Sequence, residues 1–199
     1  MADQLINLLL KHKSLTQHQI DMIADKVQIR LLKTDLYFSE AGKIANEVAF
    51  VTKGILRVCY YDKEGLEITR YFIEEGNFIC DLNSYTHQIP SSEYIQAITD
   101  VQLLVFSRRD LVNLSATIEG WDRLTQELTT NAFLEKINRI SPMLAEDATT
   151  RYINFLDKQP TLANRIPLGY LASYLGITPS SLSRIRRQLA NPHFLPNDK

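Results

Sequence analysis

The sequence predicts an α+β protein in which an antiparallel β barrel or sandwich is flanked by helices. Two observations lead to this prediction. Between residues 28 and 106, short segments rich in Val, Ile, Tyr and Phe alternate with turn residues, without intervening helices. Before and after this region, apolar residues recur at helical spacing. The strands therefore lie in the first half of the chain, and most helices lie in the second.

The composition is that of an ordinary globular protein. The chain has 199 residues, of which 45% are hydrophobic and 23% are charged, enough for one ample core or for a larger and a smaller unit. No stretch reaches the length of a membrane span, and the apolar run at 5–10 has no basic flank before it, so we expect no signal peptide. Cys59 and Cys80 form no CxxC pair, which favours a reducing cytoplasm.

The individual elements follow from local signals. Residues 2–27 are expected to be helical, with Thr16 as an N-cap. Within the β region, turn residues separate the strands. These turns are Lys53–Gly54, Asp62–Gly65, Glu75–Asn77 and Thr99–Asp100.

One long helix is predicted from residue 120, and Pro142 should end or kink it. A shorter helix, about 145–157, follows. The apolar stripe of the long helix drifts around its axis, so the helix either packs only on its own domain or also pairs with a second copy. The stripe consists of Trp121, Leu124, Leu128, Ala132, Phe133, Ile137 and Ile140.

The stretch IPLGYLASYLGITPSSLSRIRRQL, residues 166–189, is typical of a helix-turn-helix. Gly176 suits the positive φ of a tight turn, and the small Ala172 lets the two helices approach. Thr178 is a suitable N-cap for the second helix, and Pro179 suits its first position. The inward positions are all apolar: Leu171, Leu175, Ile177, Leu182 and Ile185.

The second helix of this pair is predicted to contact DNA. Short hydroxyl residues let a helix enter the major groove closely, and arginine donates to guanine or to phosphate. We expect Arg186 to meet the DNA backbone or to lie against the partner helix. The alternative is an αα-hairpin whose arginines are only solvated. The predicted DNA-binding residues are Thr178, Ser180, Ser181, Ser183, Arg184, Arg186 and Arg187.

Charge is divided unevenly along the chain. Residues 144–199 hold seven basic and four acidic side chains, a net charge of +3, whereas the remainder carries −4. This division favours an anionic partner for the C-terminal part alone.

Together with FVTKGILRVCYYDKEGLEITRYFIEEGNFICDL, residues 50–82, these motifs resemble the bacterial regulators related to the cyclic-AMP receptor protein and the fumarate/nitrate reduction regulator (Crp/Fnr). The resemblance runs from about residue 15 to residue 190. It implies a cyclic-nucleotide-binding-like β-roll (a double-stranded β-helix, or jelly-roll) over residues 1–119 and a dimerisation helix over 120–141. A helix-turn-helix domain of winged-helix type would occupy 142–199. The implied function is that of a cytoplasmic homodimer on a palindromic operator in double-stranded DNA, controlled by a small-molecule effector.

The chain departs from the family's nucleotide pocket. The family's glycine–glutamate–leucine turn corresponds to Cys80–Asp81–Leu82, and its arginine–serine pair corresponds to Ser91–Ser92. Serine cannot neutralise a phosphate, so cyclic AMP is not expected to bind. Arg57 and Arg70 are expected on a solvated strand face, where they would not compensate. The candidate effector pocket comprises Tyr71, Cys80, Asp81, Leu82, Ser91 and Ser92.

Other functions remain open at this point. A β-barrel metalloenzyme is disfavoured because the four histidines include no HxH pair, and we predict no enzyme activity, metal or cofactor. A ligand- or partner-binding regulatory module without sequence-specific DNA binding is the main alternative. An activator would also contact RNA polymerase, but no residue pattern identifies a surface for it. The final segment, NPHFLPNDK, is too short for a two-stranded wing.

Overall fold

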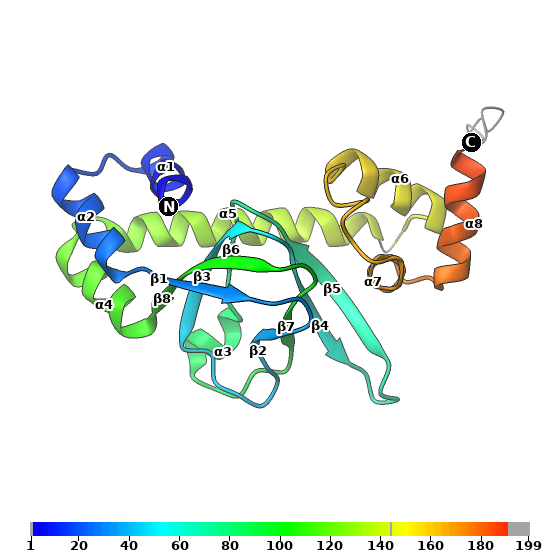
Figure 1. Cartoon of the computed structure of the whole chain (residues 1–199), viewed down its shortest axis with the longest axis horizontal. Helices are drawn as coiled ribbons and strands as arrows, with labels where there is room; N and C mark the ends of the chain where they lie inside the picture. The colour runs from blue at the N-terminus through cyan, green and yellow to red at the C-terminus, as the bar shows by residue number, and fades with distance from the viewer. Residues whose placement is uncertain (1, 144, 191–199) are drawn as a thin grey trace.

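A computed structural model describes residues 2–143 and 145–190. Two four-stranded antiparallel sheets form the centre, and one long helix joins the helices at the two ends of the molecule (Figure 1). The strands are β1 (Gln28–Leu32), β2 (Tyr37–Ser39), β3 (Glu47–Lys53), β4 (Leu56–Tyr61), β5 (Glu67–Ile73), β6 (Phe78–Ile79), β7 (Tyr94–Ala97) and β8 (Val101–Ser107). The helices are α1 (Asp3–His12), α2 (Gln17–Lys26), α3 (Leu82–His87), α4 (Arg108–Thr117), α5 (Trp121–Met143), α6 (Ala148–Lys158), α7 (Leu168–Tyr174) and α8 (Pro179–Leu189).

The predicted N-terminal helical region is two helices. α2 begins at a capping box, in which the Thr16 side chain accepts from the Gln19 backbone N–H while the Gln19 side chain accepts from the Thr16 N–H. The sequence signal for an N-cap at Thr16 is therefore confirmed, and the same cap separates α2 from α1.

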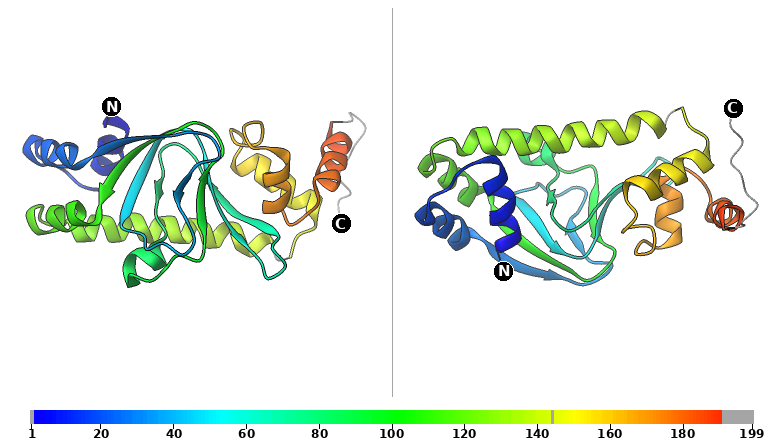
Figure 2. Two further views of the ribbon diagram at one scale, coloured as in Figure 1. Left: turned by 60° about the horizontal axis from the view of Figure 1, so that its bottom comes forward. Right: turned by 90° about the horizontal axis from the view of Figure 1, so that it is seen from above.

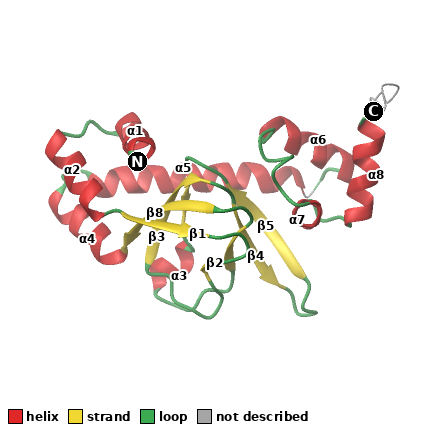
Figure 3. Ribbon diagram, viewed as in Figure 1, coloured by secondary structure: helices red, strands yellow, loops and turns green. Residues whose placement is uncertain are grey.

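The two sheets pack face to face as a β-roll. Their strand orders are β1-β8-β3-β6 and β2-β7-β4-β5, and every pairing is antiparallel, as the sequence predicts. Alternate side chains point between the sheets and form a buried apolar cluster. Figure 3 shows helices at both ends of the strand region, and the short α3 beside the lower part of the strands. The inward faces of β4 and β5 contribute Leu56, Val58 and Ile73 to this cluster.

The long helix α5 has different neighbours in its two halves. Trp121 and Leu124 are buried against α1, α2 and α4, and Leu128 packs beside them. Farther along, Phe133 is 58% exposed and Ile137 is 44% exposed. The apolar stripe of α5 thus faces its own domain in the first half of the helix and solvent in the second half. Figure 2 shows α5 running along one side of the β-roll.

The C-terminal helices share a core with the second sheet. Residues of α6, α7 and α8 cluster with Ile55, Phe72 and Ile98, which belong to the β-roll or its turns. The helical unit is therefore packed on the strands as well as being joined to them by α5. The proposed boundaries at 119 and 141 lie near the ends of α5, whereas the buried cluster crosses both of them. The C-terminal segment considered for a wing lies outside the described residues.

Gly54 provides a test of how closely the turns pack. Its φ is +91°, and a Cβ at this position would overlap the carbonyl oxygen of Asp100. Gly65 has a φ of +80°, but nothing lies within 4 Å of its Cβ position. We expect Gly54→Ala to lower the free energy of unfolding by about 3 kcal/mol, and Gly65→Ala by only ~1 kcal/mol, because only the first adds a clash to the backbone strain. Urea unfolding measures both values, and equal losses would contradict the packing at Gly54.

Candidate functional site

The pair α7 and α8 is joined by the tight turn that the sequence predicts. Gly176 has a φ of +67°, and the Ile177 N–H donates to the Ala172 carbonyl at 3.0 Å. Ala172 is fully buried, so a larger residue there would separate the helices. The predicted inward residues are buried, except that Ile177 is partly buried at the edge of the same cluster.

Hydroxyl groups gather at the start of α8. The Thr178 side chain accepts from the Ser181 N–H at 3.2 Å, which confirms it as the N-cap, and Pro179 occupies the first turn. Thr178 Oγ1 also lies 2.9 Å from Ser180 Oγ and 3.0 Å from Ser181 Oγ. The first turn of α8 thus presents short polar side chains and backbone N–H groups, to which anions are attracted.

The arginines of α8 lie in two different environments. Arg184 and Arg187 are exposed and Ser183 is half-buried, whereas Leu182 and Ile185 on the opposite side are buried. Figures 1 and 2 show α8 at the end of the molecule farthest from α1 and α2. The exposed arginines are therefore open to a large partner.

Arg186, which the sequence predicts to meet the DNA backbone or to lie against the partner helix, points back into its own domain. Its Nε donates to the Tyr152 hydroxyl at 3.0 Å, and its Nη2 donates to the Ala163 carbonyl at 3.2 Å. The guanidinium also lies 5.6 Å from the centre of the Tyr152 ring. These contacts tie α8 to α6 and to the loop before α7, so the role of Arg186 in this structure is internal.

The predicted effector residues differ in how deeply they are buried. Asp81 is buried and caps α3 by accepting from the Ser84 N–H at 3.0 Å. Ser91 is also buried, and its hydroxyl donates to the Glu93 carbonyl at 2.8 Å. Tyr71 and Cys80 are half-buried, whereas Leu82 and Ser92 are exposed.

Tyr71 connects this cluster to α5. Lys136 Nζ lies 3.1 Å from the Tyr71 hydroxyl and 4.2 Å from the centre of its ring. Burial raises the pKa of Tyr71 well above its ordinary value, and Asp81 and Cys80 are near enough to add to the shift. Sequence reasoning missed Lys136. The pattern of the strand that carries Tyr71 could not predict this contact, because Lys136 belongs to a helix and lies 65 residues away in the chain.

Both cysteines carry protonated thiols at neutral pH. Burial raises the pKa of Cys80 to about 12 and that of Cys59 to about 11. Because the thiolate is the reactive form, neither environment activates the sulfur as a nucleophile.

The two arginines that could have replaced the missing phosphate ligand are each paired with a carboxylate. Arg70 donates to Glu93 at 2.5 Å. Arg57 donates to Glu67 at 2.5 Å and is only 1% exposed, so the prediction that it lies on a solvated face was wrong. The face is covered by α7, which the sequence pattern of the strand alone cannot reveal.

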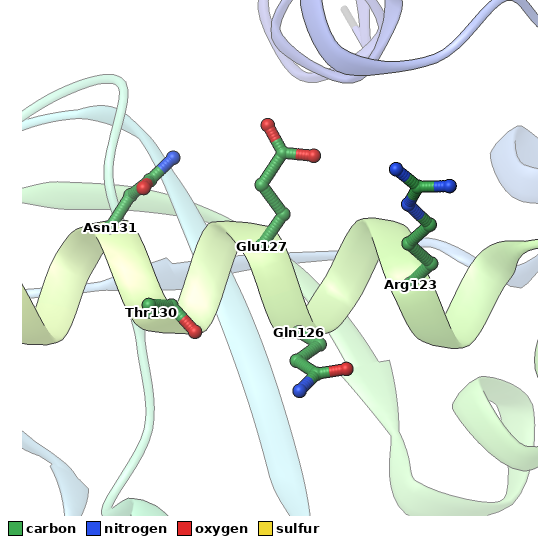
Figure 4. A pocket seen from close by; sticks show the side chains of 5 residues that line it. All are labelled: Arg123, Gln126, Glu127, Thr130 and Asn131. Carbon is green, nitrogen blue, oxygen red and sulfur yellow. The ribbon is translucent and has the colours of Figure 1, made fainter.

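A polar hollow lies on the outer side of α5, where sequence reasoning placed no site (Figure 4). Glu127 is drawn toward α1 by His12, whose Nδ1 lies 2.8 Å from the carboxylate. The hollow is lined by Arg123, Gln126, Glu127, Thr130 and Asn131.

The comparisons with known proteins agree with this arrangement. Residues 29–117, from β1 to the end of α4, match the family model of the cyclic nucleotide-binding domain. No curated protein matches the sequence significantly. Among the described residues, no helix combines the length and the hydrophobicity needed to cross a bilayer.

Similar solved structures cover nearly the whole chain. FixK2 from Bradyrhizobium japonicum has a TM-score of 0.74 at 17% identity and covers 87% of this chain and 89% of its own. The c-di-GMP-responsive global regulator CLP of Xanthomonas campestris has a TM-score of 0.72 at 15% identity, with coverages of 92% and 96%. The catabolite activator protein of Thermus thermophilus has a TM-score of 0.56 at 20% identity, with coverages of 96% and 91%. The resemblance to Crp/Fnr regulators is confirmed, and at these identities the likeness is one of fold.

The residues that the family resemblance places at the nucleotide position do not fit a cyclic phosphate. The buried Asp81 carboxylate adds negative charge, Ser91 supplies no cation, and Glu93 already engages Arg70. A buried phosphodiester needs a guanidinium or several N–H donors.

We therefore expect isothermal titration with cyclic AMP at millimolar concentration to give no binding heat. Cyclic GMP, which carries the same phosphate, serves as the matched ligand and should also give none. A saturable isotherm for either nucleotide would contradict this reading of the pocket.

Proposed function

We propose that this chain is a DNA-binding transcription regulator that acts as a homodimer on a palindromic operator. The observation that carries the proposal is α8, which is anchored by Leu182 and Ile185 and presents Arg184 and Arg187 to solvent. A helix held on one face and basic on the other matches the major groove in width and in charge.

The two exposed arginines are assigned different contacts. Arg184 lies one and a half turns from the start of α8, beside the half-buried Ser183, and we assign it to a base edge. Arg187 lies almost one turn farther along, and we assign it to phosphate. The net charge of +3 on residues 144–199 supports binding to the DNA backbone by this part of the chain.

The homodimer is proposed to form through the second half of α5. Phe133 and Ile137 are four residues apart and therefore share one face of the helix, and Leu134 beside them is 51% exposed. A second copy of this helix would remove the three apolar side chains from water. Leu128, which the sequence also offered for this interface, packs on its own core instead.

The β-roll is proposed to be the sensing part of the regulator. Its match to the cyclic nucleotide-binding domain supports a role in receiving a signal, although its residues disfavour a cyclic phosphate. An effector of another class, or a protein partner, would then shift the dimer between two arrangements of the α8 helices.

Selection from a random pool of DNA duplexes tests the function directly. With purified protein and no added ligand, we expect enrichment of a palindrome whose half-sites lie about one helical turn apart. A failure to enrich any sequence, both with the purified protein and in cell extract, would contradict the proposal and favour a regulatory module without DNA binding.

The selected duplex then tests the two arginines against each other. Arg184→Ala should cost about 1–3 kcal/mol and relax the preference at one operator position. Arg187→Ala should weaken specific and random DNA alike and reduce the slope of log K against log salt by about one unit. Equal losses on both kinds of DNA for Arg184→Ala would refute its assignment to a base.

The dimer interface is tested by placing a charge on the exposed half of α5. We expect Ile137→Asp to convert the protein to monomers, because a carboxylate between two apolar helices would be desolvated without a partner. Val112 of α4 is 59% exposed, so Val112→Asp is the matched control and should leave the mass unchanged. Sedimentation equilibrium measures both masses, and a dimeric Ile137→Asp protein would contradict the interface.

A further inference from the structure

Arg57 is the largest fully buried polar side chain among the described residues, and its partners come from neighbouring strands. Its Nε and Nη2 donate to Gln96 Oε1 of β7 at 2.9 and 2.5 Å. Its Nη1 donates to Glu67 and Thr69 of β5 at 2.5 and 3.2 Å. The N–H groups at the edge of the guanidinium are thus hydrogen-bonded within the sheet. Its flat face is left for a residue outside the sheet to cover.

That face is covered by a ring from the C-terminal unit. The centre of the Tyr170 ring, on α7, lies 3.5 Å from Arg57 Cζ. A cation at this distance from an aromatic face is attracted by the ring quadrupole, and the attraction is stronger where water is excluded. One buried charge therefore joins three strands of the β-roll to the first helix of the α7–α8 pair.

A second contact fixes α7 against the edge of the same sheet. β5 is the last strand in its sheet, so part of its backbone has no strand partner. The Ser173 hydroxyl accepts from the Thr69 N–H at 2.9 Å and donates to the Glu67 carbonyl at 3.2 Å. This pair of bonds sets the position of α7 along the strand.

A third contact lies at the other end of β5. Arg165, in the loop before α7, donates to both carboxylate oxygens of Glu75 at 3.0 and 2.6 Å. Glu75 also accepts from the Gly54 N–H at 2.7 Å, and the hydrogen bond from Arg165 lowers its pKa. Between the polar contacts, Phe72 packs on Tyr174 with ring centres 5.3 Å apart.

The strand that carries Arg57 has its other face in the core of the β-roll. Leu56 and Val58, on either side of Arg57, are buried between the two sheets. Because side chains alternate along a strand, a shift of β4 that repacks this core also moves Arg57 and the ring above it.

We propose that Arg57 and Tyr170 are positioning residues, which hold the α7–α8 pair on the β-roll and so fix where α8 stands in the dimer. The signal from the β-roll then reaches α8 directly through β4 and β5, in addition to any route along α5. This inference rests on the proposed DNA-binding function, because its consequence for DNA is a fixed distance between the two α8 helices.

The docking itself is tested without DNA by amide hydrogen exchange at Thr69. Tyr170→Leu removes the ring face but keeps an apolar side chain, and Tyr170→Phe keeps the face and serves as the matched control. We expect the protection of the Thr69 amide to fall roughly tenfold in Tyr170→Leu, with the amides of Leu56 and Val58 unchanged as evidence of an intact β-roll. Unchanged protection at Thr69 would overturn the proposal.

The consequence for DNA is tested with operators of altered spacing. The wild type and Tyr170→Phe should prefer the selected half-site spacing over spacings longer or shorter by two base pairs. In Tyr170→Leu this preference should fall by about fivefold, because the lost cation–π contact loosens α7, while the preferred half-site sequence stays the same.

Three outcomes separate the possibilities. A looser spacing preference together with exposed Thr69 supports the positioning role. Tighter binding to every operator with the spacing preference intact overturns it, because the contact would then be an inhibitory lock. If the wild type binds no DNA while Thr69 responds as expected, the docking stands and the proposed function fails.

Discussion

The removal of one guanidinium from water is the constraint on which the arrangement of the two units depends. A buried cation is tolerated only when its donors are satisfied and its charge is balanced. Arg57 meets this requirement with Glu67, Gln96 and Thr69 from the adjacent strands, and with the Tyr170 ring above it. The network is complete only when α7 is in place. The position of the C-terminal helices is therefore set by a directional polar contact. The surrounding apolar residues enlarge the buried surface between the helices and the sheet.

The two halves of α5 differ in what surrounds them. The first half is buried against the N-terminal helices and belongs structurally to the β-roll. The second half presents exposed apolar side chains. α8 thus lies at one end of the molecule, and the exposed apolar face of α5 lies along its side. In the proposed homodimer, a second copy of α5 would cover this face.

The sequence predicted the helix caps and tight turns, because these depend on a few neighbouring residues. Thr16, Thr178 and Gly176 were identified because N-caps and positive-φ turns are decided by a few neighbouring residues. The burial of Arg57 could not be predicted, since the period of a strand tells which side chains share a face and not what covers that face. The cover comes from the ring of Tyr170, more than a hundred positions later in the chain. The internal contacts of Arg186 could not be predicted for the same reason, because its acceptors lie in α6 and in the loop before α7.

The bonds of Ser173 to β5 have a consequence for how the protein behaves at high concentration. The outer strand of a sheet offers N–H and C=O groups with which a strand of another molecule can pair. Here Ser173 occupies the Thr69 N–H and the Glu67 carbonyl, and α7 lies over that margin. The contact that orients a helix for binding thus also shields the chain from self-association into extended β-structures.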